Sequence, residues 1–180
     1  MEDVSENSFW YAMRVTYCRE LKVQEILSNK SIETYIPMRY EIKVINKQKK
    51  RNKVPIIHNL IFVHTTPTII KEVKRELPYL QYIMDNRSKE KIIVPDKQMN
   101  NFIEVTSLTD KKLLYFKEED INLSKGEKVR VIGGEFKGYE GIFVKVKGAR
   151  DKRVVIAIKG IVAVAMATIN PEFIEVITQN

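Results

Sequence analysis

The first 125 residues of this 180-residue chain contain no glycine, and all seven glycines lie between Gly126 and Gly160. Glycine adopts left-handed backbone angles without steric strain, so tight hairpin turns concentrate it. A chain of this length is long enough for one domain or for two small ones. The change in composition therefore predicts two separately built halves.

Cysteine and histidine are scarce, with Cys18, His58 and His64 as the whole supply. A single cysteine excludes an intrachain disulfide and gives no support for an oxidising compartment. The two histidines fall on one expected strand, about 20 Å apart if it is extended, which is too far to share a metal. Cys18 has no histidine at a zinc-ligand spacing, and no glycine-rich phosphate loop leads into a helix. We therefore expect no metal, no cofactor and no catalysis.

Long apolar runs are also missing. The longest, residues 161–167, has seven residues, whereas a membrane-spanning helix needs about 20. The acidic start Met1-Glu2-Asp3 has no apolar segment behind it, which argues against a conventional signal peptide. With 44% hydrophobic and 30% charged residues, the composition is that of an ordinary globular protein. We expect a cytoplasmic protein without a membrane partner.

The formal net charge is +8, with a pI near 9.4. Residues 1–110 carry 18 basic and 14 acidic side chains, and residues 123–180 carry 10 and 6, so each half has a net charge of +4. A mildly basic protein suits a nucleic-acid or RNA–protein partner, although ordinary surface variation produces the same charge.

The first half alternates strand-like and helix-like patterns. Thr66-Pro67 is a typical helix start, because the threonine hydroxyl accepts a backbone N–H and proline fits the first turn. Residues 47–53 include five basic side chains and no acidic one, and their place between two extended segments predicts the tip of a long hairpin. The expected elements are strand 9–15, a helix from residue 19, strands 35–44 and 54–64, helix 66–77, short strands 81–84 and 91–94, and a helix from residue 96. This β-α-β-β-α-β-β-α order predicts an α+β fold with helices on an antiparallel sheet.

The second half is dominated by the hairpin sequence KGEKVRVIGGEFKGYEGIFVKV at residues 125–146. Its glycines predict a tight bulged turn, and the alternating apolar residues on both sides predict strands with one buried face. Further strands at 153–158, 161–168 and 174–177 would make a small five-stranded barrel. Residues 111–122 are polar and are expected to be a linker, in which the apolar segment 113–116 docks on one domain. The predicted domains are therefore residues 1–110 and 123–180.

The hairpin at 125–146 resembles the KOW motif of small SH3-like barrels in NusG-type transcription factors and some ribosomal proteins. The first half resembles the NusG N-terminal domain, through Trp10-Tyr11, the Tyr35-Ile36-Pro37 strand and a basic hairpin leading into residues 54–63. His58-Asn59-Leu60 departs from the family's usual proline-glycine-tyrosine or proline-asparagine-tyrosine turn. Among specialised NusG paralogues the chain most resembles the UpxY-type antiterminators of Bacteroides capsular-polysaccharide operons, with RfaH as a relative in role.

This resemblance implies an antitermination and elongation factor whose first domain binds the clamp helices of the largest RNA polymerase subunit. Binding there favours the closed clamp and suppresses pausing or termination. Carried onto this sequence, the apolar docking depression would involve Ile57, with Ile56 and Tyr17 beside it. An ordinary core position is the alternative for Ile57 and for Tyr17.

The resemblance also implies two further contact surfaces. Basic side chains would face upstream DNA, the displaced non-template strand or nascent RNA: Lys47, Lys49, Lys50, Arg51, Lys53 and Arg14. A solvated loop is the alternative for the basic run. At the turn of the KOW hairpin, Phe136 and Lys137 are candidates for contacting a small ribosomal subunit protein or the Rho terminator.

Two other classes of protein are alternatives to a NusG-type factor. An rRNA-binding ribosomal or ribosome-maturation protein shares the KOW motif but does not need the domain from Trp10 to Phe102. A nucleic-acid-modifying enzyme needs a catalytic cluster that the sequence lacks. The β-branched runs and glycines of residues 123–180 also predict a stable barrel in place of an RfaH-like helical form.

Overall fold

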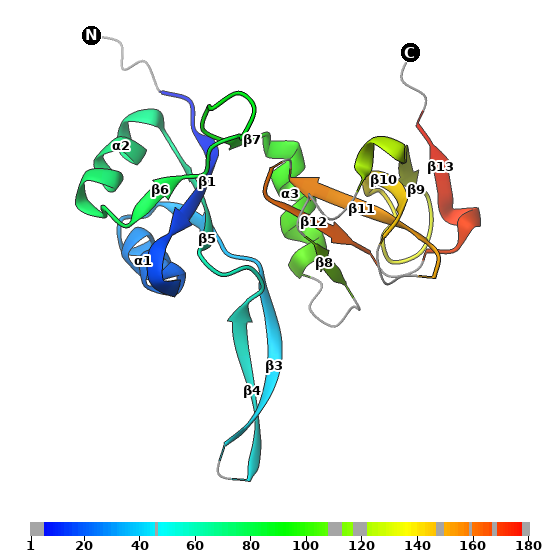
Figure 1. The fold of residues 1–180 in the computed structure, drawn as a ribbon, viewed down its shortest axis with the longest axis horizontal. Coiled ribbons are helices and arrows are strands. Elements are labelled where there is room, and N and C mark those ends of the chain that lie inside the picture. Colours follow the sequence, from blue (N-terminus) through cyan, green and yellow to red (C-terminus); the bar gives the residue numbers. More distant parts are fainter. Residues whose placement is uncertain are drawn as a thin grey trace. The chain divides into compact units, whose positions relative to one another are not determined.

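The computed structural model describes residues 6–45, 47–107, 113–116, 122–146, 150–158, 160–166 and 169–177 (Figure 1). The chain divides into two compact units, Met1–Met99 and Asn100–Asn180. The first unit is α+β, with helices on an antiparallel sheet, and the second is mainly β. This is the order predicted from the sequence. No helix in the described ranges is long and apolar enough to cross a membrane.

The first unit is built around strand β1, Phe9–Val15, which lies inside an antiparallel sheet. Its neighbours are β5 on one side and β6 and β7 on the other, and β2 pairs with β5. The bounds are β2 Glu33–Tyr35, β5 Leu60–Thr65, β6 Leu80–Tyr82 and β7 Ile93–Val94. Successive strand residues point to opposite faces, and both Tyr11 and Ala12 are fully buried, so both faces of β1 are covered.

Two helices close one face of this sheet. Helix α1, Glu20–Asn29, contributes Val23 and Leu27 to the core, and helix α2, Pro67–Glu76, contributes Ile70 and Val73. They pack on alternate residues of the central strands, among them Tyr11, Met13, Val15, Ile61 and Val63. Thr66 Oγ1 accepts a hydrogen bond from the backbone N–H of Ile69 at 3.3 Å, which confirms the predicted start of α2.

Helix α3, Asp96–Ser107, follows β7, and the division between the two units falls inside it. Met99, Phe102 and Val105 are fully buried, and Thr106 is buried with its hydroxyl donating to the carbonyl oxygen of Phe102 at 2.6 Å. A threonine on the buried face is tolerated because this hydrogen bond satisfies its hydroxyl. The helix predicted from residue 96 is therefore present, with Met99, Phe102 and Val105 on its buried face.

The sequence-based prediction of one strand over residues 54–64 was wrong. Strand β4 ends at Pro55, strand β5 begins at Leu60, and a turn occupies residues 56–59 between them. Asn59 has φ 64°, a left-handed conformation that interrupts an extended strand and that asparagine adopts more readily than most residues. The apolar residues Ile56 and Ile57 favoured a continuous strand, although the family resemblance places a turn at residues 58–60.

Strands β3, Met38–Ile45, and β4, Gln48–Pro55, form a separate two-stranded ribbon that projects from the first unit (Figure 1). We call residues 38–55 the arm. Eight residue pairs join its strands, from Met38 opposite Pro55 to Ile45 opposite Gln48. The basic run was predicted at the tip of a hairpin, and only Lys47 lies at the turn, whereas Lys49 to Lys53 belong to strand β4.

The second unit contains a six-stranded antiparallel sheet in the order β13-β9-β10-β11-β12-β8. Its strands are β8 Leu114–Phe116, β9 Glu127–Val131, β10 Glu140–Lys145, β11 Lys152–Ile158, β12 Val162–Ala165 and β13 Ile174–Val176. The expected count was five. The sixth strand is β8, which lies in the predicted linker and pairs with β12, as its apolar residues suggested. Residues 111–112 and 117–121 of that linker lie outside the described part of the chain.

The glycine-rich hairpin of this unit has the predicted form, with β9 and β10 paired from Glu127 opposite Phe143 to Arg130 opposite Glu140. At its turn Gly138 has φ 95° and donates its N–H to the carbonyl oxygen of Val131 at 2.7 Å. A side chain at this φ is strained, which is why glycine is needed there. Arg130 donates to Glu140 Oε1 at 2.7 Å across the same pair of strands, on the exposed face.

Candidate functional site

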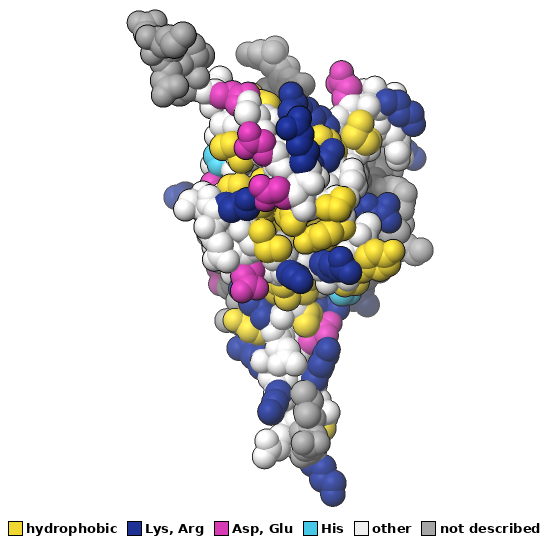
Figure 2. Space-filling model, turned by 90° about the vertical axis from the view of Figure 1, so that its left-hand side faces the viewer, with side chains coloured by type: hydrophobic (Ala, Val, Ile, Leu, Met, Phe, Trp, Pro, Cys, Tyr) yellow, Lys and Arg dark blue, Asp and Glu magenta, His cyan; other side chains and the backbone are white. Residues whose placement is uncertain are grey.

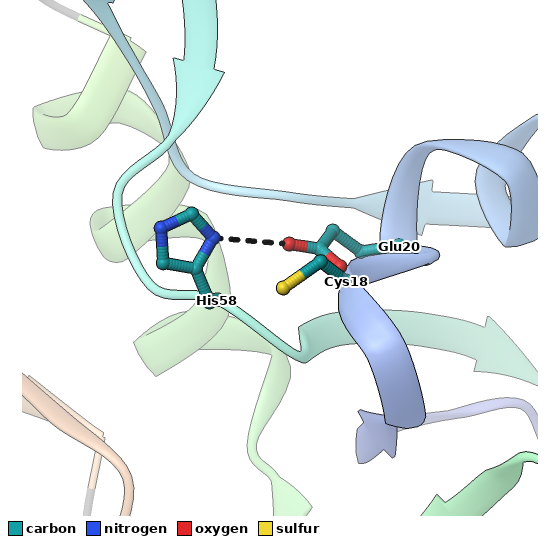
Figure 3. Close-up of side chains that lie close together, drawn as sticks. All are labelled: Cys18, Glu20 and His58. Atoms are coloured by element: carbon teal, nitrogen blue, oxygen red, sulfur yellow. Dashed lines mark ion pairs between the residues drawn. The ribbon is translucent and has the colours of Figure 1, made fainter.

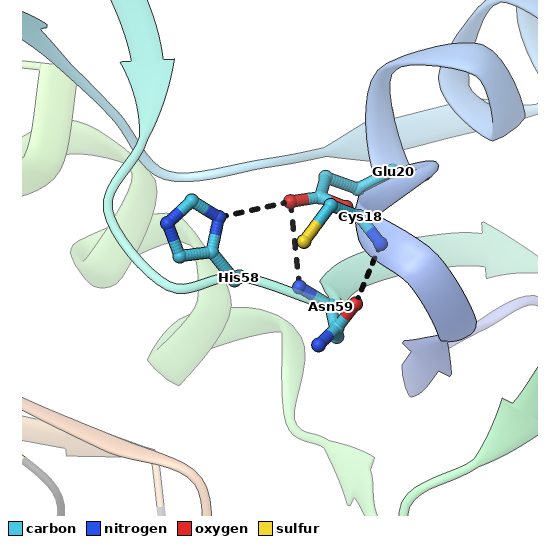
Figure 4. A network of polar contacts seen from close by, with 4 residues as sticks. All are labelled: Cys18, Glu20, His58 and Asn59. Atoms are coloured by element: carbon cyan, nitrogen blue, oxygen red, sulfur yellow. Dashed lines mark hydrogen bonds and ion pairs between the residues drawn. The ribbon is translucent and has the colours of Figure 1, made fainter.

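Two segments that are 40 residues apart in sequence are tied together at one end of the first unit (Figure 4). The first is the loop between β1 and α1, and the second is the turn at residues 56–59. We call the group that joins them the clasp: Cys18, Glu20, His58 and Asn59. The backbone N–H of Cys18 donates to Asn59 Oδ1 at 2.9 Å, and the N–H of Asn59 donates to Glu20 Oε1 at 3.3 Å.

The backbone of the clasp is strained on both sides. Tyr17 has φ 62° and Cys18 has φ 51°, and Asn59 on the opposite segment has φ 64°. Left-handed angles in non-glycine residues cost on the order of 1–3 kcal/mol each and persist only where the surroundings impose them. Here the hydrogen bonds of Asn59 impose them, including one from the N–H of Val15 to its carbonyl oxygen at 2.9 Å.

The three residues predicted to bind polymerase lie on the two segments that the clasp joins. Tyr17 is 81% exposed, so the alternative that it is a core aromatic is wrong. Ile56 and Ile57 are half-buried in the turn. The guanidinium carbon of Arg19 lies 5.4 Å from the centre of the Tyr17 ring and 5.2 Å from that of Tyr79, within the range of cation–π attraction. Tyr17 therefore stands at the surface with a cationic neighbour.

The clasp also brings together three potential metal ligands (Figure 3). One ligand atom each from Cys18, Glu20 and His58 lies within 4.8 Å of the other two. This cluster could not be predicted from the sequence, because Cys18 and His58 are 40 residues apart and His58 was expected on a straight strand. The turn at 56–59 is what places His58 beside Cys18. Cys18 therefore has a histidine neighbour in space, although it has none at a zinc-ligand spacing in the sequence.

The predicted nucleic-acid-binding residues fall on the arm, with one exception. Residues opposite each other in an antiparallel pair share a face, so Tyr40, Ile42 and Val44 share one face with the residues paired with them. We call this the mixed face of the arm: Tyr40, Ile42, Val44, Lys49, Arg51 and Lys53. Its apolar members are exposed, with Ile42 at 69% and Val44 at 67%.

Lys50 lies on the opposite face of the arm, directly across from Lys43. On the mixed face, the guanidinium carbon of Arg51 lies 3.8 Å from the centre of the Tyr40 ring, which holds the two side chains together. Figure 2 shows basic side chains along the length of the arm and apolar side chains gathered on the body above it. Arg14 is exposed on β1 between Leu60 and Gln81, so it belongs to the sheet and not to the arm.

The two residues predicted at the turn of the second unit differ in exposure. Lys137 is exposed, as expected of a contact residue. Phe136 is only 6% exposed, and its ring lies edge-on to that of Tyr139 with the centres 6.4 Å apart. Phe136 was therefore wrongly assigned to a contact surface, because an aromatic ring at a turn can fold back and pack.

One family model matches this chain, and several solved structures are similar to it. The family model described as "Transcription termination factor nusG" matches residues 8–103, more than half of the chain. The solved structure titled "Domain interaction in Thermotoga maritima NusG" is similar at 17% identity and a TM-score of 0.45, covering 96% of this chain and 98% of that one. A second, of an MjSpt4:Spt5 complex, has 18% identity and a TM-score of 0.28, covering 94% and 97%. No curated protein matches.

The matched range starts just before β1 and ends within α3, so it takes in the central sheet, the arm, the clasp and both helices of the first unit. This range is the half of the chain that a ribosomal KOW protein would not need. The family consists of transcription factors and not of enzymes, which confirms that no catalytic activity is to be expected. The chain belongs to the NusG family of transcription factors.

Proposed function

We propose that this protein is an elongation and antitermination factor that binds RNA polymerase through residues 1–110. The observation that carries the proposal is the exposed Tyr17, on a segment hydrogen-bonded to the turn that holds Ile57. Exposed aromatic residues beside partly buried aliphatic ones are typical of the anchors of protein interfaces. Ile56, Ile57 and Tyr17 are the proposed contacts with the clamp helices of the largest subunit.

The mechanism follows from differential binding. A factor that contacts the polymerase more strongly with its clamp closed than with it open raises the closed population by the ratio of the two affinities. Closed, elongation-competent complexes then pause and terminate less often. A surface already held in its binding conformation loses less conformational entropy on binding. The hydrogen bonds of the clasp join the segments that carry Tyr17 and Ile57.

The other two surfaces complete the proposal. The arm contacts upstream DNA or the displaced non-template strand, with nascent RNA as a further ligand, through its basic side chains. Residues 123–180 act as a second domain that reaches a small ribosomal subunit protein or Rho, with Lys137 at its exposed turn. The likeness to the UpxY-type antiterminators supports capsular or exopolysaccharide operons as targets.

The test is copurification of core RNA polymerase with tagged protein, together with transcription through a terminator. If Ile57 is an interface anchor, Ile57→Asp weakens polymerase binding by about 30-fold or more. The substitution removes the apolar contact and places an unpaired charge in the interface. Tyr17→Ala does the same without touching the core, since Tyr17 is 81% exposed. Ile69→Asp is the control, because it makes the same substitution at an isoleucine of α2 that is 38% exposed.

Thermal melting establishes that all three variants are folded. Loss of polymerase binding in Ile57→Asp and Tyr17→Ala, with Ile69→Asp unchanged, supports the proposal. Polymerase retained equally by all three variants would refute the assignment of this surface, and failure of the unmodified protein to retain polymerase would refute the function itself.

A further inference from the structure

We propose that Cys18, Glu20 and His58 form a binding site for a divalent transition-metal ion, with Zn²⁺ as the best match. The three side chains offer one sulfur, one oxygen and one nitrogen atom, the ligand types that zinc takes in proteins. They come from two segments, with Cys18 and Glu20 at the start of α1 and His58 in the turn 56–59 (Figure 3).

The distances suit a tetrahedral ion. His58 Nδ1 lies 3.6 Å from Glu20 Oε1. Two ligands on one tetrahedral zinc, with bonds of 2.0–2.2 Å, are about 3.4 Å apart. All three ligand atoms lie within 4.8 Å of one another, so small side-chain rotations bring the sulfur into range as well.

The second observation is the state of the Glu20 carboxyl group. Glu20 is 1% exposed, and its Oε1 accepts the N–H of Asn59. Its other oxygen, Oε2, is buried and has no hydrogen-bond partner among the residues that the structure describes. A buried carboxylate with an unsatisfied oxygen is costly, and helix α1, which begins at Glu20, offsets only part of that cost through its dipole. A bound cation would neutralise the charge of the carboxylate and use the oxygen lone pairs that accept no hydrogen bond.

The surroundings keep the ligands in place and leave a way in. The hydrogen bond from the Cys18 N–H to Asn59 Oδ1 fixes the backbone of the cysteine, and that of Asn59 to Glu20 fixes the turn next to His58. Cys18 is exposed and the His58 side chain is 67% exposed, so an ion can enter from solvent. Three protein ligands leave the fourth position to a water molecule, as in other open zinc sites.

Binding requires one change of protonation. The Cys18 thiol gives up its proton to solvent as the Zn–S bond forms, and nothing is oxidised or reduced. The ion would then link the start of α1 to the turn that carries Ile57. In the proposed function this link stiffens the polymerase-binding surface, and only that consequence rests on the proposed function.

Cobalt titration of the full-length, metal-stripped protein tests the site. Co²⁺ is used as the probe because a thiolate ligand gives a charge-transfer band and tetrahedral geometry gives strong visible bands. We expect one Co²⁺ per chain, displaced by Zn²⁺, and a melting temperature that rises with added Zn²⁺. Cys18→Ser should abolish the charge-transfer band.

Three further variants separate a metal site from a structural contact. His58→Ala and Glu20→Gln should weaken Co²⁺ binding on the order of tenfold or more. Glu20→Gln keeps an oxygen for the N–H of Asn59, so the clasp itself is preserved. His64→Ala is the matched control, because the other histidine pairs with Glu33 at 2.8 Å and is not in the cluster; it should bind Co²⁺ normally.

Absence of the charge-transfer band, or Co²⁺ affinity unchanged in Cys18→Ser and Glu20→Gln, would overturn the proposal. Failure of this site is distinguishable from failure of the proposed function, because cobalt binding is measured without polymerase. Polymerase retention is measured separately, with and without a chelator.

Discussion

The arm has two faces that carry different side chains, and we predict that only the mixed face binds nucleic acid strongly. Lys49 and Lys53 lie on the mixed face, and Lys43 and Lys50 lie opposite each other on the other face. All four lysines are exposed. The double variants Lys49→Gln/Lys53→Gln and Lys43→Gln/Lys50→Gln therefore remove the same charge from the same arm and differ only in the face they change.

The expected magnitude follows from counterion release. Each phosphate neutralised on duplex DNA contributes about −0.9 to the slope of log K against log salt, and about −0.7 on a single strand. If Lys49 and Lys53 each contact one phosphate, their removal makes the slope shallower by about 1.8 on a duplex or about 1.4 on a single strand. Over a fourfold increase in salt, the unmodified protein then loses about twelvefold more duplex affinity than this variant does.

The measurement is fluorescence anisotropy with a labelled duplex and a labelled single strand of mixed sequence, each at a series of salt concentrations. Lys49→Gln/Lys53→Gln should show the shallower slope, and Lys43→Gln/Lys50→Gln should keep a slope within about 0.5 of the unmodified protein's. Equal slope changes in both variants would mean that the arm acts as a charged rod with no preferred face. No change in either would mean that its lysines do not contact phosphates at all.

Two predictions concern stability. The Tyr11 hydroxyl is buried, and no described residue forms a hydrogen bond with it. Tyr11→Phe should therefore raise the free energy of unfolding by about 1 kcal/mol in urea denaturation, and a lower free energy would contradict this. Burial also raises the pKa of Tyr11 above 10.0. The unfolded chain then ionises first, stability falls as the pH rises above 10, and the fall should be smaller in Tyr11→Phe. A Cβ at Gly141 would lie 2.7 Å from the Val155 carbonyl oxygen. Gly141→Ala should therefore lower the free energy of unfolding by about 1–3 kcal/mol in the same assay. An unchanged midpoint would show that β10 and β11 can move apart to admit the methyl group.

Elements with local signals were predictable from the sequence. Helix α2 begins where Thr66 and Pro67 predicted, because capping and proline geometry act within one turn. Strand β1 also occupies residues 9–15 as expected, since its continuous run of strand-forming residues requires burial on both faces. In the second unit, the glycine at position 138 marked the turn at which a left-handed residue is needed.

The turn at 56–59 and the position of the basic run were not predictable from these signals. Apolar residues before and after Asn59 resemble one buried strand, and the left-handed Asn59 is held by partners 39 and 41 residues away. The arm's turn contains Lys47 at φ 61°, where glycine is the usual choice, so nothing in the sequence separated the turn from the strand that follows. A run of basic residues indicates that a segment is exposed to solvent, but it does not indicate where the hairpin turn lies.

Three of the six left-handed non-glycine residues described in the glycine-free half lie at the clasp or directly beside it. Tyr17, Cys18 and Asn59 together store several kcal/mol of backbone strain, a sizeable part of the roughly 5–15 kcal/mol that stabilises a domain. Glycine at these positions would remove the strain, but it would also remove the exposed Tyr17 ring, the Cys18 thiol and the Asn59 amide that holds the loop. Strained backbone at residues whose side chains are retained, here around the buried Glu20, is expected where the surface is functional. In this protein the strained residues lie at the junction of the β1–α1 loop and the 56–59 turn, the surface proposed to bind polymerase.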